Sequence, residues 1–275
     1  MKILLLGCDG QVGWELQRSL APLGEVVALG SAGDGALHGD FSRPEALAAT
    51  VRAVAPDVIV NAAAHTAVDR AESEPELART INAAAPGVLA REARERGAWL
   101  VHYSTDYVFD GSGSAPWTED AATGPLGVYG RTKLEGEDAI RASGCRHLIF
   151  RTSWVYAARG KNFYLTMKAR RGQPLRVIDD QRGVPTSSRF LAENTLLLIN
   201  KNIEGVLHLV PSGATTWYGF ARAILGEQAD ITPIRSSEYK TAARRPANSV
   251  LDNRKAQALL GKPLPDWRAV FAAVR

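Results

Sequence analysis

A tyrosine followed four positions later by a lysine occurs twice in this chain, at residues 129–133 (Tyr-Gly-Arg-Thr-Lys) and 164–168 (Tyr-Leu-Thr-Met-Lys). Four residues are about one helical turn, so the two side chains of each pair would share one face of a helix. A tyrosine, with a reference pKa of about 10, gives a proton to a carbonyl oxygen at neutral pH when a nearby cation stabilises the phenolate. Either pair could be the acid of a carbonyl reduction, and the spacing alone does not choose between them.

Short apolar runs alternate with longer segments rich in Ala, Leu, Glu and Arg through the first half of the chain. The alternation predicts an α/β fold, a Rossmann-type doubly wound parallel sheet with helices on both faces. Pro44 and Pro75 suit the first turns of two helices, with Ser42 and Ser73 nearby as caps. Strands are predicted at residues 3–6, 26–29, 58–60, 99–103 and 148–150, and helices at 12–20, 44–54, 76–96 and 129–142.

The pattern loosens after about residue 155, where Gly and Pro separate shorter elements. We therefore expect a dinucleotide-binding Rossmann domain over residues 1–155. Residues 156–275 are expected to hold the remaining sheet elements and a smaller substrate-binding lobe. No linker marks a sharp boundary between the two.

Three glycines with the spacing Gly-x-x-Gly-x-x-Gly follow the first predicted strand and open the first predicted helix. Such glycines allow a tight turn and a close approach of backbone to a pyrophosphate, and the helix N-terminus supplies amide donors. A purely structural turn would use the same residues, but the position between a first strand and a first helix favours dinucleotide binding. The cofactor-binding residues expected here are Gly7, Gly10, Gln11, Val12 and Gly13.

Two later segments are further candidates for cofactor contacts. The Asp40 carboxylate could accept a hydrogen bond from an adenine amino group and the Phe41 ring could cover the base, although a helix-capping loop explains the same residues equally well. After the third strand, the small side chains of Ala62, Ala63 and Ala64 would let the backbone line the cofactor.

Position along the chain distinguishes the two tyrosine–lysine pairs. The fourth strand runs into Thr105, which places a hydroxyl at the carboxyl end of a central strand, where open parallel sheets bind their ligands. The next long helix begins near Tyr129, so Thr105, Tyr129 and Lys133 are expected to converge as catalytic residues beside a nicotinamide. Tyr164 follows the fifth strand, and a packing role is expected for it.

Composition excludes several other classes of protein. The chain has 275 residues, 45% of them hydrophobic, and its net charge of +4 comes from 33 basic and 29 acidic residues without a run of like charges. A nucleic-acid partner is therefore not expected. Cys8 and Cys145 have no metal-ligand spacing. Because no apolar stretch reaches 18 residues and the first apolar run is too short for a signal peptide, we expect no membrane partner and a cytoplasmic protein.

Long segments of the chain resemble the dTDP-4-dehydrorhamnose reductase family, an extended or atypical branch of the short-chain dehydrogenases. The resemblance spans nearly the whole chain, and the motifs that carry it are long. They are residues 61–69 (Asn-Ala-Ala-Ala-His-Thr-Ala-Val-Asp), 104–111 (Ser-Thr-Asp-Tyr-Val-Phe-Asp-Gly), 129–137 (Tyr-Gly-Arg-Thr-Lys-Leu-Glu-Gly-Glu), 151–156 (Arg-Thr-Ser-Trp-Val-Tyr) and 179–186 (Asp-Asp-Gln-Arg-Gly-Val-Pro-Thr).

The resemblance implies a reaction and a role for each matching residue. A hydride would pass from the reduced nicotinamide to C4 of dTDP-4-dehydro-L-rhamnose, and Tyr129 would deliver the proton to the oxygen. Lys133 would hold the nicotinamide ribose and ease proton loss from the tyrosine, while Thr105 would hydrogen-bond the carbonyl. The residues implied to bind this dTDP-sugar are Thr66, Val68, Ser104, Thr105, Tyr107 and Trp154, although some of them could be ordinary loop or core packing.

Related enzymes of the same fold are the main alternatives. A 4,6-dehydratase would be expected to follow its threonine with Asp-Glu, but here Thr105-Asp106 is followed by Tyr107, so dehydration is disfavoured. Another sugar-nucleotide reductase or epimerase stays open. So does a non-catalytic regulatory subunit, like that of methionine adenosyltransferase, which resembles the same family and can keep the nucleotide loop.

The choice of cofactor depends on the end of the second strand, where an acidic side chain would bind the ribose 2′-hydroxyl and repel a 2′-phosphate. Residues 29–31 (Leu-Gly-Ser) offer neither a carboxylate nor an arginine. We therefore expect NADPH to be used at least as well as NADH.

The end of the chain bears on metal binding and on assembly. Some members of the resembled family form a metal-bridged dimer whose carboxylate ligands come partly from this segment, but residues 265–275 contain one acid, Asp266. We expect no metal site, and a monomer or weak homodimer. The spacing of Trp267, Val270, Phe271 and Val274 predicts a short closing helix packed on its own domain.

Overall fold

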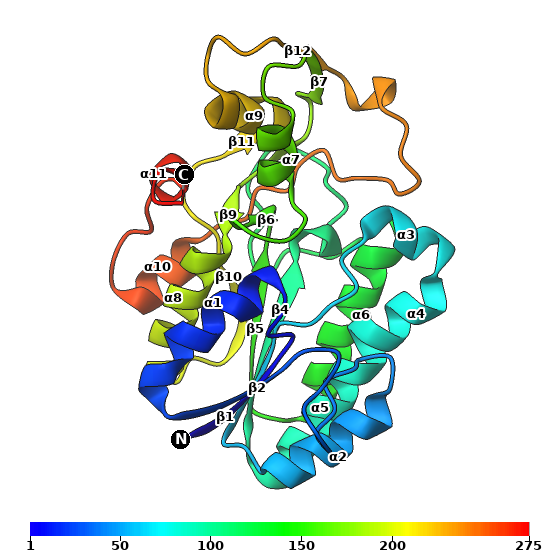
Figure 1. Ribbon diagram of the computed structural model, residues 1–275, viewed down its shortest axis with the longest axis vertical. Coiled ribbons are helices and arrows are strands. Elements are labelled where there is room, and N and C mark those ends of the chain that lie inside the picture. Colours follow the sequence, from blue (N-terminus) through cyan, green and yellow to red (C-terminus); the bar gives the residue numbers. More distant parts are fainter. Residues whose placement is uncertain (275) are drawn as a thin grey trace.

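Six short strands form one parallel sheet at the centre of the computed structural model, which describes residues 1–274 (Figure 1). Five of them fall where the sequence predicts strands, and the sixth comes from the second half of the chain. The strands are β1 (Lys2–Leu6), β2 (Glu25–Leu29), β3 (Val58–Asn61), β4 (Trp99–Thr105), β5 (His147–Thr152) and β10 (Gly205–His208). Their order across the sheet is β10-β5-β4-β3-β1-β2, and every neighbouring pair is parallel.

The order of the strands changes direction at β1. The chain passes from β1 to β2 on one side, and β3 then returns to the other side of β1. Ligands of open parallel sheets bind beyond the carboxyl ends of the strands at such a switch point. The predicted doubly wound fold is confirmed, and it puts the expected site beyond β1, β3 and β4.

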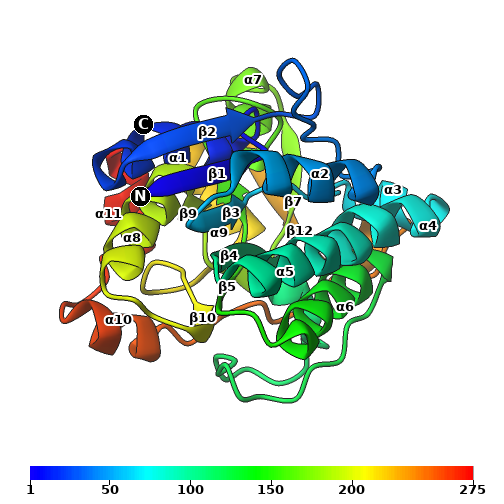
Figure 2. The same ribbon diagram turned by 90° about the horizontal axis from the view of Figure 1, so that it is seen from below.

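Helices cover both faces of the sheet, so the strands are apolar on both sides. Ile3 and Leu5 pack under α1 (Gln11–Leu20) and α8 (Ser188–Asn200). Leu4 and Leu6 face the opposite layer. That layer consists of α2 (Pro44–Val54), α5 (Ala85–Arg96) and α6 (Val128–Ser143), seen on the far side of the sheet from α8 in Figure 2.

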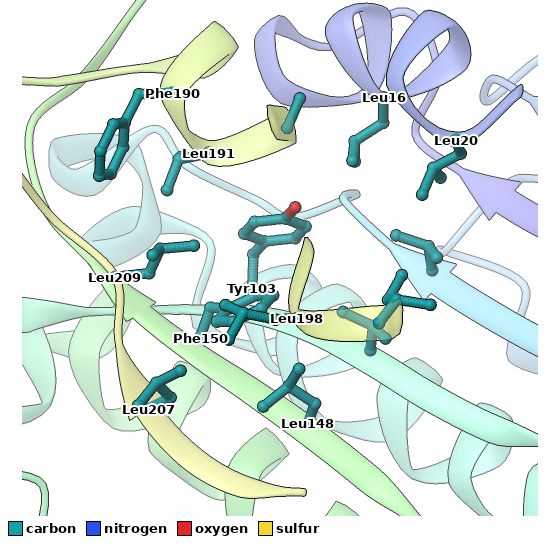
Figure 3. Close-up of a cluster of buried hydrophobic side chains, with 14 of the residues drawn as sticks. Leu16, Leu20, Tyr103, Leu148, Phe150, Phe190, Leu191, Leu198, Leu207 and Leu209 are labelled. Carbon is teal, nitrogen blue, oxygen red and sulfur yellow. The ribbon is translucent and has the colours of Figure 1, made fainter. Parts of the chain in front are cut away.

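Leucines from the two helices of the first layer meet aromatic residues of the central strands in one buried cluster (Figure 3). Leu16 of α1 and Leu198 of α8 belong to it, and both are 0% exposed. Tyr103 of β4 enters the same cluster, where its hydroxyl lies 2.6 Å from the Thr195 hydroxyl. The phenol is therefore buried with a partner, as a buried polar group requires.

Residues from the second half of the chain also build a smaller region with its own core, above the sheet in Figure 1. Its strands pair as β6 (Val155–Tyr156) with β9 (Thr186–Ser187), β7 (Leu175–Ile178) with β12 (Ile231–Ile234), and β8 (Arg182–Gly183) with β11 (Thr215–Thr216). Its helices are α7 (Phe163–Ala169), α9 (Trp217–Leu225) and α11 (Trp267–Ala272). Helix α10 (Arg254–Leu260) instead packs beside α8 and β10, and its buried residues join the core under α1 and α8. The predicted closing helix is α11, with Trp267, Val270 and Phe271 buried.

The helix predicted over residues 76–96 is interrupted. The structure has α3 (Val68–Ser73), α4 (Pro75–Arg79), a π-helical turn (Thr80–Ala84) and then α5. Pro86 explains the wide turn, because it has no N–H to donate to the Asn82 carbonyl four residues earlier. Short 3₁₀ turns lie at Ala21–Leu23, Asp106–Val108 and Ser236–Glu238.

The predicted serine caps are wrong, although both prolines do begin helices. The capping positions of α2 and α4 are Arg43 and Glu74, and neither side chain caps the helix. The Ser42 hydroxyl donates to Asp40 and the Ser73 hydroxyl to the Arg70 carbonyl. Within the described residues, no helix is both long and apolar enough to cross a membrane.

Gly136 provides a test of the packing between α6 and the π-helical turn. A Cβ at Gly136 would overlap the backbone oxygen of Asn82, whereas one at Gly87 of α5 would lie 3.3 Å from the Ala139 Cβ. Overpacking against backbone costs roughly 1–3 kcal/mol, and replacing a helical glycine by alanine gains about 1 kcal/mol. We expect Gly136→Ala to lower the free energy of unfolding in urea, and Gly87→Ala, whose Cβ meets only a side chain, to leave it unchanged or raise it by up to about 1 kcal/mol. Equal values for the two variants would contradict this account.

Candidate active site

The glycine loop lies between the ends of β2 and β3. The Gly7 N–H donates to the Leu29 carbonyl of β2 (2.8 Å), and Gly7 has a φ of +81°. A Cβ on Gly7 would lie 2.7 Å from the Ala63 backbone nitrogen, and one on Gly13 would overlap the Gly7 carbonyl. Glycine is therefore required at both positions by close backbone packing at the switch point.

The first turn of α1 opens onto this loop. Gly10 is the capping residue and brings no side chain to the helix end, so the first amides are not covered by a cap. The Gln11 side-chain oxygen accepts a hydrogen bond from Asn162 Nδ2 at the start of α7 (2.7 Å), and Val12 packs against the core. A glycine cradle beside an uncapped helix N-terminus fits the pyrophosphate of a dinucleotide.

The loop that follows β3 is held by two asparagines. Asn61 Oδ1 accepts from the Ala63 N–H (3.0 Å). Asn82, in the π-helical turn, accepts from the His65 N–H (2.8 Å) and donates to the His65 carbonyl (3.1 Å). Ala62, Ala63 and Ala64 are all partly exposed at the sheet edge. Their small side chains lie where the sequence placed them, beside the glycine loop.

The segment with Asp40 and Phe41 has the features of a capping loop. The Asp40 carboxylate accepts from the backbone N–H and the hydroxyl of Ser42 (2.9 and 2.8 Å), and these bonds lower the pKa of Asp40. Phe41 is 4% exposed and packs in the core beside Leu4 and Leu6. Its ring therefore has little surface left for an adenine, and Asp40 stays a candidate contact.

Thr105 and Tyr129 come together as the sequence predicted. Thr105 ends β4 and Tyr129 lies in the first turn of α6, and the Thr105 hydroxyl is close enough to the phenol to lower its pKa. The Thr105 hydroxyl also donates to Asp106 Oδ1 (2.9 Å). Burial raises the pKa of Tyr129 to about 12, against the opposing effect of the nearby Thr105 hydroxyl. Burial likewise raises the pKa of Asp106 to about 6.

Lys133 lies one turn further along α6 and is 1% exposed. Its ammonium donates to the Tyr103 carbonyl of β4 (2.6 Å), and Nζ lies 3.1 Å from Nε2 of His102. Burial lowers the pKa of Lys133 to about 8, and the negative charge of Glu137 opposes this shift. Lys133 comes four residues after Tyr129 and so lies on the same face of α6, and a buried cation near the phenol is the arrangement that proton donation by Tyr129 would require.

The hydrogen bonds around His102 define its protonation. Because Asn61 Oδ1 accepts from the Ala63 amide, Asn61 must turn Nδ2 toward His102 Nδ1 (3.0 Å). Nδ1 is then the acceptor, so the proton of the neutral ring is on Nε2, which faces Lys133. Burial and the charge of Lys133 keep the pKa of His102 well below its usual range. An Nε2–H group disfavours the charged form of Lys133 and can donate to its neutral form.

A buried ion pair supports α6 on the sheet. Arg151 Nη2 of β5 donates to Glu137 Oε2 (2.7 Å), with the two side chains 3% and 0% exposed. Ser104, implied by the resemblance to bind substrate, donates its hydroxyl to Glu137 Oε1 (2.5 Å). Its side chain therefore holds β4 to α6.

The other residues implied to bind substrate come from the segment before and at the start of α3, the turn after β4 and the segment after β5. Thr66 is exposed in the loop before α3, and Val68 begins that helix. The Tyr107 ring packs edge-on against Tyr129, with 5.5 Å between centroids. Beside α3, Arg245 pairs with Asp69 (2.6 Å), a contact the sequence analysis missed.

Trp154 has an unusual backbone and a stacked partner. Its φ is +45°, which is rare for a bulky residue and costs of order 1–3 kcal/mol. The indole stacks on Trp217 of α9, with centroids 3.6 Å apart and 9° between planes. A Cβ on Gly183 would overlap the Trp154 indole, so Gly183 makes room for the ring. The sequence did not indicate Trp217 as part of this site.

Tyr164 has the packing role expected for it. It is 2% exposed and packs edge-on against Tyr156 and Phe271 in the core of the smaller region. Lys168 Nζ donates to its hydroxyl (3.2 Å). The second tyrosine–lysine pair is thus formed, but it lies in the lobe core, away from the carboxyl end of β4.

A glycine loop at the switch point and a Thr–Tyr–Lys set at the end of β4 define a Rossmann-type oxidoreductase of the short-chain dehydrogenase class. The family model described as RmlD substrate binding domain matches residues 1–274. The chain belongs to this family.

Known relatives agree over their whole length. The dTDP-4-dehydrorhamnose reductase of Escherichia coli (strain K12) is 50% identical, over 98% of this chain and 95% of its own. The crystal structure of a dTDP-4-dehydrorhamnose reductase from Clostridium acetobutylicum superimposes with a TM-score of 0.90 at 36% identity, covering 100% of this chain and 98% of its own. The Bacillus anthracis enzyme in complex with NADP has a TM-score of 0.91 at 29% identity, covering 99% and 98%.

The contact between His102 and Lys133 leads to a measurable pKa. In the His102→Gln variant the side-chain amide can turn its oxygen toward Nζ, which favours the charged amine. We expect the pKa of Lys133, about 8 in the parent protein, to rise by about one pH unit, or roughly 1.4 kcal/mol. Carbon-13 NMR of labelled lysine side chains measures it, with Lys133→Arg to assign the signal.

The matched control is His208→Gln. His208 is also 0% exposed, but its ring packs against Phe109 on another part of the sheet. This variant removes a buried imidazole without altering the surroundings of Lys133. If both variants left the Lys133 titration unchanged, the role assigned to His102 would be wrong.

Proposed function

We propose that this chain is an NADPH-dependent reductase that converts dTDP-4-dehydro-L-rhamnose to dTDP-L-rhamnose. The observation that carries the proposal is the convergence of Thr105, Tyr129 and Lys133 at the carboxyl end of β4. The names of the full-length relatives support the substrate, and the NADP complex of the Bacillus anthracis enzyme supports the cofactor. NADH is the second cofactor.

The backbone at the switch point would hold the dinucleotide. Gly7, Gly10 and Gly13 form the pyrophosphate cradle with the first turn of α1. The loop after β3 would line the nicotinamide side, because its small residues lie against the glycine loop. When bound, the reduced nicotinamide supplies the hydride that the C4 carbonyl accepts.

Proton delivery is the task of the chain itself. Tyr129 Oη would give its proton to the C4 oxygen, and the nearby Thr105 hydroxyl would hold the carbonyl in line with the phenol. With a pKa of about 8, Lys133 is mostly charged at neutral pH, so its ammonium stabilises the phenolate that remains. Lys133 would also bind the nicotinamide ribose.

The sugar would be bound on the side of the site that faces the smaller region. Tyr107 and Trp154 offer ring surfaces, and Thr66 and Val68 approach from the loop and first turn of α3. We assign residues 156–275 the role of completing the sheet and binding substrate. A 4,6-dehydratase would need a second acid after Asp106, where Tyr107 stands.

Replacing Tyr129 by phenylalanine tests the acid directly. We expect Tyr129→Phe to lower turnover by roughly 10²- to 10⁴-fold while the affinity for NADPH is retained, because only the proton donor is lost. Tyr164→Phe should keep near-normal turnover, since Tyr164 packs in the lobe core. Oxidation of NADPH with dTDP-4-dehydro-L-rhamnose measures both. A reversed result would exchange the roles of the two pairs, and an inactive parent protein would favour a regulatory subunit.

Chelation tests the expected independence from metal. Among the described residues, no group of three or more His, Cys, Asp or Glu side chains is arranged to hold an ion. The one acid of the closing segment, Asp266, caps α11. We expect EDTA to leave both turnover and molar mass by light scattering unchanged, with the protein a monomer or weak homodimer. Loss of activity and dissociation that magnesium reverses would contradict this expectation.

A further inference from the structure

Gly30, the residue after β2, has no side chain, and the Asp9 carboxylate lies where a side chain on residue 30 would be. In Rossmann-type folds an acidic side chain near this strand end binds the ribose 2′-hydroxyl of NADH and repels the 2′-phosphate of NADPH. Here β2 ends at Leu29 and the next residue is Gly30, which has no side chain. The Leu29 carbonyl accepts from the backbone N–H groups of Gly7 and Cys8 (2.8 and 3.2 Å), so the glycine loop packs directly on the end of β2.

The carboxylate of Asp9 lies in that space. A Cβ built on Gly30 would overlap Asp9 Oδ2 and would lie 2.7 Å from its Cγ and 3.4 Å from its Oδ1. Asp9 comes from the glycine loop, 21 positions before Gly30 in the chain, so the carboxylate reaches the end of β2 from a neighbouring loop. Its position is the one that a short side chain on residue 30 would take.

The carboxylate is available to a ligand. Asp9 is exposed, and within the described part of the chain its hydrogen bond comes from the Cys8 thiol, a weak donor 3.8 Å away. By contrast, the nearby Asp40 carboxylate is engaged by the amide and hydroxyl of Ser42. Asp9 therefore keeps free acceptor positions beside the expected ribose position.

We propose that Asp9 sets the balance between NADPH and NADH in this chain, by accepting from the ribose 2′-hydroxyl of NADH and opposing the 2′-phosphate of NADPH. The inference rests on the proposed dinucleotide site and not on the identity of the sugar. Residues 29–31 alone gave no reason to expect such a carboxylate, because it belongs to another loop. Asp9 brings NADH into competition with NADPH at a site that would otherwise favour the phosphorylated cofactor more strongly.

Binding measurements without substrate test the proposal independently of turnover. Asp9→Asn keeps the shape of the side chain and removes the charge. We expect the ratio of the NADH to the NADPH dissociation constant to rise by about tenfold or more, with most of the change in NADPH, and to change less at high salt. Asp34→Asn is the control, because Asp34 is an exposed carboxylate in the turn after β2. Its ratio should stay within about twofold of the parent value.

A second variant tests the packing. In Gly30→Ala the new Cβ takes the space of Asp9 Oδ2, so the carboxylate must move and the ratio should shift in the same direction as in Asp9→Asn. An unchanged ratio in both variants, or an equal shift in Asp34→Asn, overturns the role of Asp9. A parent protein that binds neither dinucleotide overturns the proposed function as well, and the two failures are therefore distinguishable.

Discussion

The close contact between the backbone of Gly7 and the loop after β3 is the constraint on which the site depends. With a φ of +81° and no side chain, Gly7 lets the turn after β1 lie against Ala63 while its amide bonds the end of β2. Three strand ends are thus held together at the switch point. This contact fixes where α1 begins and where the glycine loop places Asp9. It also sets the position of the loop with Ala62, Ala63 and Ala64.

The charged side chains near the end of β4 are of two kinds: a buried ion pair that supports α6, and the buried amine of Lys133. Glu137 and Arg151 neutralise one another under α6, and their mutual bonds satisfy charges that would be costly to leave unpaired. Within residues 1–274, Lys133 is buried without a salt-bridge partner of its own, and its bonds go to the Tyr103 carbonyl and to His102. The chain therefore keeps one amine in an environment where its charge is easily lost, one helical turn after Tyr129.

The sequence predicted those parts of the molecule that depend on local pattern and on topology. Apolar runs such as residues 99–103 identified the strands, and the rule that ligands bind at carboxyl strand ends separated Tyr129 from Tyr164. Its failures arose where a residue acts through a neighbour distant in the chain. The tautomer of His102 is set by Asn61 on the neighbouring strand β3. Trp217 belongs to the site because it stacks on Trp154.

Local rules also failed where they competed with one another. Pro86 is suited to the first turn of a helix, yet the apolar pattern of the sequence is helical on both sides of it. The structure has a π-helical turn just before Pro86, which the spacing of apolar residues did not indicate. Ser42 was predicted to cap a helix, but its hydroxyl donates to the Asp40 carboxylate instead. Side chains with several possible partners are decided by the folded surroundings, which a one-dimensional pattern does not contain.

The stacked tryptophans have a consequence for how sequences of this kind can diverge. Trp154 lies over Gly183, so any side chain at residue 183 collides with the indole while the indole is present. A smaller residue at 154 would remove that restriction and would also leave Trp217 without its stacking partner. The three positions therefore cannot change one at a time. A lineage that replaces the indole at 154 passes through intermediates with a void beside α9, and compensating changes at 183 and 217 should accompany it.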